Sequence, residues 1–160
     1  MPNKVSTVDM LDDVSTSVQV CGACNAVRKE ADGQLVGDMF DGQGFVRGLA
    51  RKVRPAKGAS ALIIGSGGVG SAIAVAMAEA GVGHLALYDT RSETMEKLTD
   101  RLQQFFPKLS IQVGSNDPAG FEIVVNATPL GMEPGDPLPF DVERISPETM
   151  VGEVVMKQEE

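Results

Sequence analysis

Hydrophobic and polar positions follow an alternating strand and helix pattern in the second half of the chain. A short apolar run at 61–64 leads into a glycine-rich turn, and an Ala-rich stretch follows at 69–80. In that stretch Val69, Ile73 and Met77 fall on one stripe. Short apolar runs are typical of buried parallel strands, and a stripe at this spacing is typical of a helix. We therefore predict a strand at 61–64 and a helix at 69–80.

The same alternation continues to the end of the chain. Further strands are predicted at 84–88, 111–113, 121–125 and 150–155. A second amphipathic helix is predicted between the strands at 84–88 and 111–113, and Thr90 and Glu93 favour a capping box at its start. Repeated strand–helix units indicate an α/β fold. We expect a Rossmann-like doubly wound parallel sheet with helices on both faces.

The segment before residue 58 has a different pattern. Its expected elements are a short helix at 5–14, extended chain at 18–21 and 26–27, a hairpin at 32–33 and a helix at 43–54. The hairpin is predicted because Asp-Gly is a strong turn signal. The last helix is expected to end before Pro55, because proline disfavours helical geometry in the preceding residue. This segment is expected to form a smaller, partial α/β unit.

The net charge of the chain bears on which kinds of molecule it can bind. The chain has 160 residues, with 14 Lys and Arg against 22 Asp and Glu, which gives a net charge of −8. An acidic chain repels phosphate backbones and anionic lipid, so we expect neither a nucleic-acid nor a membrane partner. No apolar stretch approaches the ~20 residues that span a bilayer. No apolar leader is visible, and we expect a cytoplasmic protein.

Cys21 and Cys24 have the CxxC spacing of some metal and redox sites. Zinc would need two further ligands, and the only histidine, His84, lies in a different motif. A redox pair would favour a helix start, whereas these cysteines are expected in extended chain. We predict buried, reduced thiols, no metal site and no catalytic role for His84.

The glycine-rich turn has the spacing of a dinucleotide fingerprint. Gly65, Gly67 and Gly70 come directly after a predicted strand and open a helix. The first glycine permits the tight turn, the second lets the backbone approach a pyrophosphate, and the third lets helix and strand pack closely. The helix N-terminus offers free N–H groups to the phosphates. The residues expected to bind them are Gly65, Ser66, Gly67, Gly68, Val69 and Gly70.

An acidic residue completes the fingerprint at the end of the next predicted strand. Asp89 lies 19 positions after Gly70 and can accept hydrogen bonds from ribose hydroxyls. Its carboxylate would repel a 2′-phosphate, which favours NAD, whereas Arg91 could pair with that phosphate and leaves NADP open. S-adenosylmethionine-dependent methyltransferases also combine a glycine-rich loop with an acidic strand end, so that class remains an alternative.

Several ordered segments together resemble shikimate dehydrogenases and their quinate-using relatives. They are Met1–Lys4, Gly22–Val27, Gly37–Phe45, the glycine turn with 71–74, and Asn126–Met132, which reads NATPLGM. The last segment matches a specific motif of that family. Order and spacing agree over essentially the whole chain.

The resemblance implies a two-domain oxidoreductase that oxidises a ring hydroxyl reversibly with a nicotinamide cofactor. The implied division is a partial substrate-binding domain at 1–41, a connecting helix and linker at 42–57, and an NAD(P)-binding domain at 58–160. Lys4 and Asp41 would be the catalytic pair, and Asn25 would bind substrate hydroxyls. The resemblance further implies that Asn126, Ala127, Thr128 and Met132 lie in the cofactor site. The family analogy also suggests a homodimer and domains that close over the substrate.

Departures from the family pattern bear on the substrate and on the extent of the chain. Met39 and Phe40 stand where the family has Asn-Thr before the catalytic Asp, and Asn3 replaces a His. Shikimate, quinate or a similar cyclic hydroxy acid is expected as the small-molecule substrate. The family's flanking substrate-binding segments have no counterpart here, so we expect a middle portion of a longer enzyme. The alternative is an incomplete or non-catalytic dinucleotide-binding module.

Overall fold

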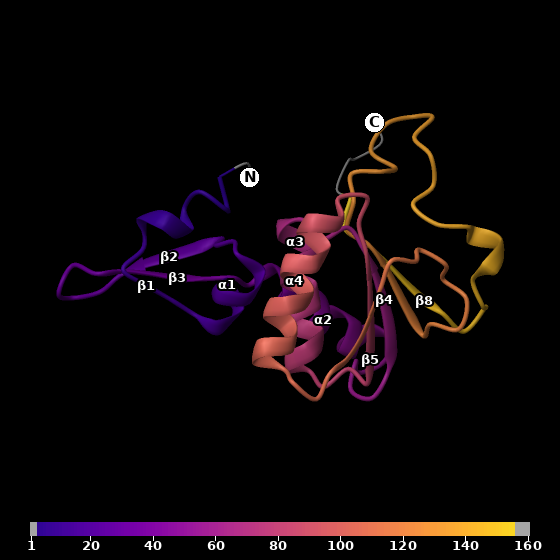
Figure 1. Cartoon of the computed structure of the whole chain (residues 1–160), viewed down its shortest axis with the longest axis horizontal. Coiled ribbons are helices and arrows are strands. Elements are labelled where there is room, and N and C mark those ends of the chain that lie inside the picture. The colour runs from indigo at the N-terminus through magenta and orange to yellow at the C-terminus, as the bar shows by residue number, and fades with distance from the viewer. Residues whose placement is uncertain (1–2, 156–160) are drawn as a thin grey trace.

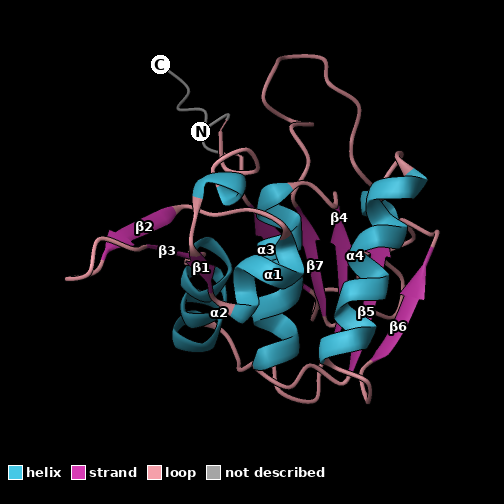
Figure 2. Cartoon of the chain, turned by 60° about the vertical axis from the view of Figure 1, so that its left-hand side comes forward, coloured by secondary structure: helices cyan, strands magenta, loops and turns pink. Residues whose placement is uncertain are grey.

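Five parallel strands form the main sheet of the computed structural model, which describes residues 3–155. The strands are β4 (Ser60–Ile64), β5 (His84–Tyr88), β6 (Ser110–Val113), β7 (Ile123–Asn126) and β8 (Met150–Glu153). They lie in the order β6-β5-β4-β7-β8, and every neighbouring pair is parallel. Figure 2 shows β6, β5, β4 and β7 of this sheet. This order confirms the Rossmann-like α/β sheet. Met1 and Pro2 of the N-terminal motif, and residues 156–160, lie outside the described residues.

Side chains alternate between the two faces of this sheet. On one face, Ile63 and Leu85 join the main hydrophobic core with residues of α3 (Gly68–Glu79) and α4 (Ser92–Phe105). On the other face, Leu62 and Val124 pack with Phe140 in a smaller cluster. The segment 127–149, which contains the 3-10 helix η2 (Val142–Arg144), contributes Phe140 and Ile145 to that second face, whereas α3 and α4 lie on the opposite side (Figure 1).

A second, three-stranded sheet forms from the N-terminal part of the chain. It contains β1 (Asp13–Val14), β3 (Leu35–Asp38) and β2 (Ala26–Lys29), in that order. Strands β2 and β3 are antiparallel and form the predicted hairpin. Gly33 adopts φ +94° in its turn, a left-handed conformation that glycine reaches without a steric cost.

Two predictions for this part of the chain are wrong. Residues 5–14 form the 3-10 helix η1 (Val8–Met10) followed by β1 instead of one helix. Helical spacing is overridden there because Asp12 pairs with Leu35: its N–H donates to the Leu35 carbonyl, and its side chain accepts from the Leu35 N–H. Residues 18–21 are helical, within α1 (Thr16–Cys21), and not extended.

Local capping explains α1. The Ser15 hydroxyl accepts a hydrogen bond from the Val18 N–H, and Gly22 ends the helix at φ 67°. Val18, Val20 and Cys21 are all buried, because α1 contacts both α3 and α4. Burial on several sides hides the helical period, so the run resembles a strand in sequence.

The predicted capping box at Thr90 is also wrong. Helix α4 begins at Ser92, its N-cap residue is Arg91, and no side chain caps it. The Asp89 carboxylate accepts a hydrogen bond from the Arg91 N–H at 2.9 Å, which fixes the turn before the helix. The other predicted helices begin within two residues of their expected starts, as α2 (Asp41–Lys52) and α3.

Close packing of α2 on α3 joins the two sheets. A Cβ on Gly42 would lie 2.0 Å from the Ala72 carbonyl oxygen, so only glycine permits this approach. Val18 and Met39 from the smaller unit lie in the same core cluster as Ile73 and Met77 of α3. The N-terminal part of the chain is therefore packed on α3 through α1 and α2. Within residues 3–155, no helix combines the length and apolar character needed to cross a bilayer.

Candidate active site

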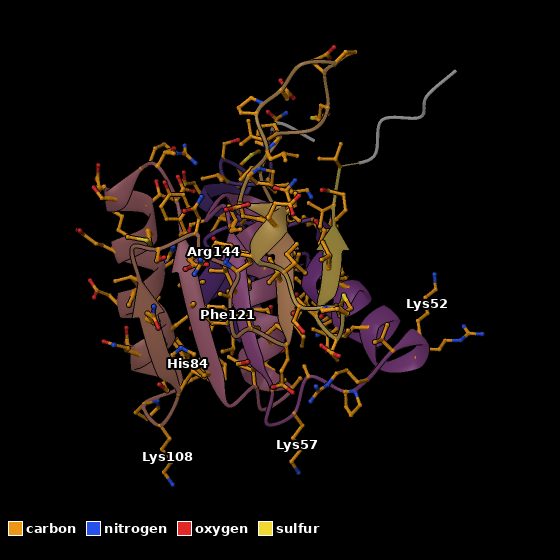
Figure 3. The ribbon with its side chains drawn as sticks, turned by 90° about the vertical axis from the view of Figure 1, so that its right-hand side faces the viewer. Lys52, Lys57, His84, Lys108, Phe121 and Arg144 are labelled. Carbon is orange, nitrogen blue, oxygen red and sulfur yellow. The ribbon has the colours of Figure 1, made fainter. Side chains whose placement is uncertain are left out.

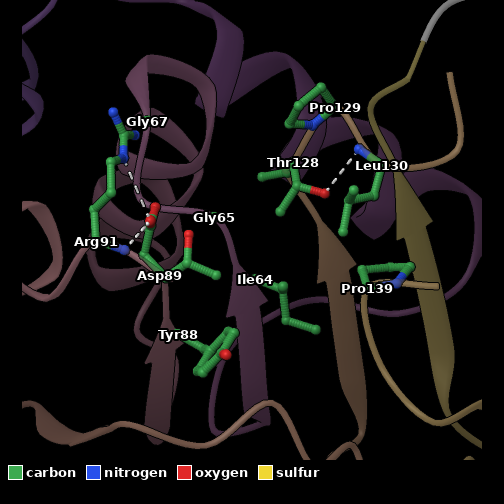
Figure 4. A pocket seen from close by; sticks show the side chains of 12 residues that line it. Ile64, Gly65, Gly67, Tyr88, Asp89, Arg91, Thr128, Pro129, Leu130 and Pro139 are labelled. Carbon is green, nitrogen blue, oxygen red and sulfur yellow. Dashed lines mark hydrogen bonds and ion pairs between the residues drawn. The ribbon is translucent and has the colours of Figure 1, made fainter. Parts of the chain in front are cut away.

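The strand order creates a crevice at the carboxyl ends of the central strands. From β4, the chain continues first to β5 on one side and later to β7 on the other. Ligands of open α/β sheets bind at such a switch point. A pocket of about 510 Å³ lies there. It is lined by Ile64, Gly65, Gly67, Tyr88, Asp89, Thr90, Arg91, Ala127, Thr128, Pro129, Leu130 and Pro139 (Figure 4).

Two of the three fingerprint glycines lie where a side chain would clash with backbone, and the third lies in open space. Gly65 has φ +100°, and a Cβ on it would lie 2.7 Å from the Ala127 carbonyl oxygen. A Cβ on Gly70 would lie only 1.9 Å from the Gly65 carbonyl oxygen. A Cβ on Gly67 would meet nothing within 4 Å, so the backbone there is open to the pocket. This arrangement fits the close approach of a pyrophosphate.

The start of α3 has the features of an anion-binding terminus. Gly67 is its N-cap, and no side chain caps the helix. Gly68 and Val69 form its first turn, where N–H groups lack partners within the helix. The Ser66 hydroxyl is buried and has no hydrogen-bond partner among residues 3–155. The unpartnered groups of these residues are of the kind that can bind phosphates, and their role in binding a dinucleotide stays a prediction.

Asp89 links the glycine loop to the next strand end. Its Oδ2 accepts from the Ser66 N–H at 2.6 Å, and its Oδ1 accepts from the Arg91 N–H. The Asp89 side chain is only 8% exposed, whereas that of Arg91 is 68% exposed with its Nε 3.6 Å from Asp89 Oδ1. Arg91 thus keeps its guanidinium available at the pocket rim, and Asp89 faces the pocket from a fixed position.

The loop after β7 forms the opposite wall of the pocket. Ala127 and Thr128, which the resemblance assigns to the cofactor site, line this pocket, but the side chain of Asn126 is 1% exposed and lies behind the wall. Asn126 Oδ1 accepts hydrogen bonds from both the N–H and the hydroxyl of Thr128. Met132 is 41% exposed and lies outside the pocket lining. Asn126 therefore shapes the wall from inside the protein.

Lys4, Asp41 and Asn25 form one polar cluster, although they come from distant parts of the sequence. Lys4 Nζ makes an ion pair with Asp41 Oδ2, and Asn25 Nδ2 donates to Asp41 Oδ1 at 2.5 Å. Asn25 Oδ1 accepts from the Phe40 N–H at 3.0 Å. The Lys4 and Asp41 side chains are 18% and 31% exposed, so both are partly shielded and still reachable. The three residues that the resemblance singled out thus lie together.

This cluster lies near the glycine loop. A Cβ on Gly68 would lie 3.7 Å from the Ala23 side chain, two residues before Asn25. Asp41 opens α2 directly before Gly42, which packs on the Ala72 carbonyl of α3. The polar cluster and the dinucleotide pocket therefore lie beside the same half of α3.

The two departures before Asp41 have different environments. Met39 is 2% exposed and packs in the main core. Phe40 is 49% exposed and precedes Asp41, so its ring is the one available to a ligand.

The remaining chemically active side chains lie elsewhere. Cys21 and Cys24 are free and buried, and burial raises the pKa of the Cys21 thiol. His84 begins β5, at the opposite end from Asp89, and stacks on Phe121 with ring centroids 6.0 Å apart (Figure 3). Among residues 3–155, no three His, Cys, Asp or Glu side chains gather as a metal-ligand set.

Sequence reasoning missed several residues of the pocket. Tyr88 and Thr90 flank Asp89, and their position at the strand end is a signal that could have identified them. Pro139 carries no such signal, because it belongs to the long segment that folds back over the second sheet face.

A glycine loop between a parallel strand and a helix, with an acidic residue after the next strand, defines a Rossmann-type dinucleotide-binding fold. No protein-family model matches the chain. Shikimate dehydrogenase (NADP(+)) of Rubrobacter xylanophilus is 33% identical over 98% of the chain and 56% of that protein. Quinate dehydrogenase of Corynebacterium glutamicum, solved in complex with NAD, is 33% identical over 96% and 56%, with a TM-score of 0.81. The 5-ketofructose reductase of Gluconobacter sp. strain CHM43 is 31% identical over 97% and 57%, with a TM-score of 0.82.

These matches have two consequences. The chain resembles the shikimate and quinate dehydrogenase family in sequence and fold over nearly its whole length. It also spans just over half the length of each of these proteins, at 56–57%.

Proposed function

We propose that the chain is the dinucleotide-binding and catalytic portion of an oxidoreductase. It would transfer a hydride reversibly between NAD or NADP and a hydroxyl or ketone of shikimate, quinate or a similar cyclic hydroxy acid. The observation that carries the proposal is the Lys4–Asp41–Asn25 cluster beside the glycine loop.

The proposed chemistry needs a proton to move with the hydride. A bound nicotinamide supplies the hydride acceptor in the oxidative direction. As hydride leaves the carbinol carbon, Lys4 Nζ in its neutral form takes the hydroxyl proton and becomes an ammonium group. In the reductive direction the ammonium donates that proton to the ketone oxygen and stabilises the charge that develops there. Asp41 Oδ2 holds Nζ in place in both forms, as a hydrogen-bond acceptor for the amine and as an ion-pair partner for the ammonium group.

The proposed substrate class follows from the groups around Lys4. Asn25 Nδ2 has one N–H bonded to Asp41 and a second that can bind a substrate hydroxyl. Two of the similar solved structures are named quinate dehydrogenase and 5-ketofructose reductase, which supports this class. The exposed Phe40 ring beside the cluster favours a substrate that presents an apolar ring face there.

The proposed cofactor is NAD or NADP. The buried Asp89 carboxylate can accept from ribose hydroxyls, which favours NAD. The exposed Arg91 guanidinium at the rim can pair with a 2′-phosphate, which supports NADP binding.

A non-catalytic dinucleotide-binding module is the second candidate. The observation in its favour is that the chain spans just over half the length of the similar proteins. Such a module would bind the dinucleotide through the same pocket without turning over substrate.

Two measurements separate the candidates. Nicotinamide absorbance is followed with shikimate, quinate and 5-ketofructose, each paired with NAD(H) and NADP(H), and dinucleotide binding is measured by fluorescence. For the enzyme, Lys4→Ala lowers turnover by about 10²–10⁴-fold while binding of the dinucleotide persists. Lys108→Ala, an exposed lysine elsewhere, serves as the charge-matched control. Binding without turnover in any pairing would favour the module, and full turnover by Lys4→Ala would contradict the assigned role.

A further inference from the structure

Glu153, at the end of β8, makes a contact with the pocket wall that no motif indicates. Its Oε2 accepts a hydrogen bond from Asn126 Nδ2 at 2.8 Å. Asn126 ends β7 directly before the pocket-lining loop, and it pairs with Glu153 in the parallel register of the sheet. We propose that Glu153 is a positioning residue that holds Asn126, and through it the Thr128–Leu130 wall, in the shape that binds the dinucleotide. This inference rests on the proposed dinucleotide binding.

The Asn126 amide is fully used inside the protein. Its Nδ2 donates to Glu153 Oε2 and to the Leu130 carbonyl at 3.0 Å. Its Oδ1 accepts from the Thr128 N–H at 3.1 Å and from the Thr128 hydroxyl at 2.7 Å. An amide side chain offers two donors and two acceptor lone pairs, so every position is filled. A group that is 1% exposed and saturated in this way acts on the pocket through its neighbours.

The chemistry of Glu153 fixes which way the amide faces. A carboxylate only accepts hydrogen bonds, so it selects the Nδ2 end of Asn126. With the amide turned over, Oδ1 would face the Glu153 carboxylate and Nδ2 would face the Thr128 N–H. Both contacts would be repulsive. The second carboxylate oxygen, Oε1, accepts from the Val155 N–H at 2.8 Å, so Glu153 is itself held at two points.

The fixed amide orients the pocket wall. Thr128 uses its hydroxyl proton on Asn126 and accepts the Leu130 N–H at 3.1 Å. Its methyl group therefore points toward the glycine loop, where a Cβ on Gly65 would lie 3.1 Å from it. Thr128 and Leu130 both line the pocket, on the side opposite Asp89 and Arg91 (Figure 4). Loss of the Glu153 carboxylate would free the amide to turn and the wall to move.

The experiment measures the dissociation constant of NADH and NADPH on the full 160-residue chain by nicotinamide fluorescence. Glu153→Ala is expected to weaken binding of both by about tenfold, because a charge-assisted hydrogen bond to a buried group is lost. Glu153→Gln can still accept from Asn126 and is expected to stay within about threefold of the parent. Glu143→Ala, an exposed glutamate of η2, removes the same charge and is expected to leave binding unchanged.

A second readout needs no ligand. Amide hydrogen exchange at Leu130, followed by NMR, is expected to become faster in Glu153→Ala and to recover in Glu153→Gln. Equal binding by Glu153→Ala and the parent would overturn the proposal. If the parent binds neither dinucleotide, the proposed function fails. In that case unchanged Leu130 exchange in Glu153→Ala would also overturn the positioning role, and faster exchange would support it as a structural property of the wall.

Discussion

The carboxylate of Asp89 accepts a hydrogen bond from the backbone N–H of Ser66 at 2.6 Å, although the two residues follow different strands. Asp89 directly follows β5, and Ser66 lies in the glycine loop after β4. The same side chain that can face a ribose therefore also holds the phosphate-binding loop. Substitution of Asp89 should therefore weaken binding of both NADH and NADPH, whereas substitution of Arg91 should affect NADPH alone.

Arg91→Ala is expected to weaken NADPH binding by about tenfold and to leave NADH binding unchanged. The reason is that the guanidinium is 68% exposed, so besides its contact with Asp89 it can pair with the additional phosphate of NADPH. Asp89→Ala should instead weaken both dinucleotides, because the Ser66 contact is lost. Fluorescence titration of both variants with both cofactors checks this. Equal weakening of NADH and NADPH by Arg91→Ala would rule out its role in discrimination.

Gly70→Ala is expected to lower the free energy of unfolding by about 1–3 kcal/mol and to impair dinucleotide binding. The new Cβ would lie 1.9 Å from the Gly65 carbonyl oxygen, which is backbone and cannot move aside cheaply. Gly48→Ala is the matched control, because a Cβ there meets nothing within 4 Å. That variant should gain about 0.5–1 kcal/mol, since alanine favours a helix over glycine. Chemical denaturation of the two variants measures the difference, and equal stability would contradict the packing argument.

The two cysteines are expected to react slowly with a thiol reagent in the native protein. Both are buried, and burial raises the pKa of Cys21 in the folded chain. The stability that this thiol contributes is fully present below the pKa of the unfolded thiol and declines as pH rises through the folded value. Reaction at mildly alkaline pH should be at least about 100-fold faster in denaturant. Rapid native labelling of Cys21 would contradict the buried-thiol interpretation.

Acid should weaken the contact between β4 and the segment before β7. The Ser60 N–H and then the Arg54 guanidinium lower the pKa of Glu122 below its ordinary value. A lowered folded pKa means that the stabilising effect is present above the unfolded pKa and is lost as pH falls through the folded value. Glu122→Gln should therefore flatten the loss of stability below about pH 4.3. Thermal unfolding across that range tests it, with Glu143→Gln as the control, and parallel pH profiles for Glu122→Gln and the parent would argue against it.

Much of the main sheet could be predicted from the sequence, because its signals are local. The run at 61–64, the glycines that follow it and Asp89 lie within one β–α–β unit, where apolar period and turn chemistry agree. The helix at 16–21 was missed for the opposite reason. Burial against α3 and α4 removed its polar face, so the period that identifies a helix was absent from the sequence.

Some features of the candidate site could likewise be predicted from the sequence, and others could not. Residue types and spacing determined the glycine loop, the acidic strand end and the parallel fold, because each depends on neighbours along the chain. The tertiary structure alone decided that Lys4 meets Asp41 across 37 positions, that Asn126 lies behind the pocket wall, and that Glu153 holds it there. Such contacts depend on how α2 packs on α3 and how β8 aligns with β7. The number of residues between two positions does not say whether they will meet. Only the packing of the helices and strands decides that.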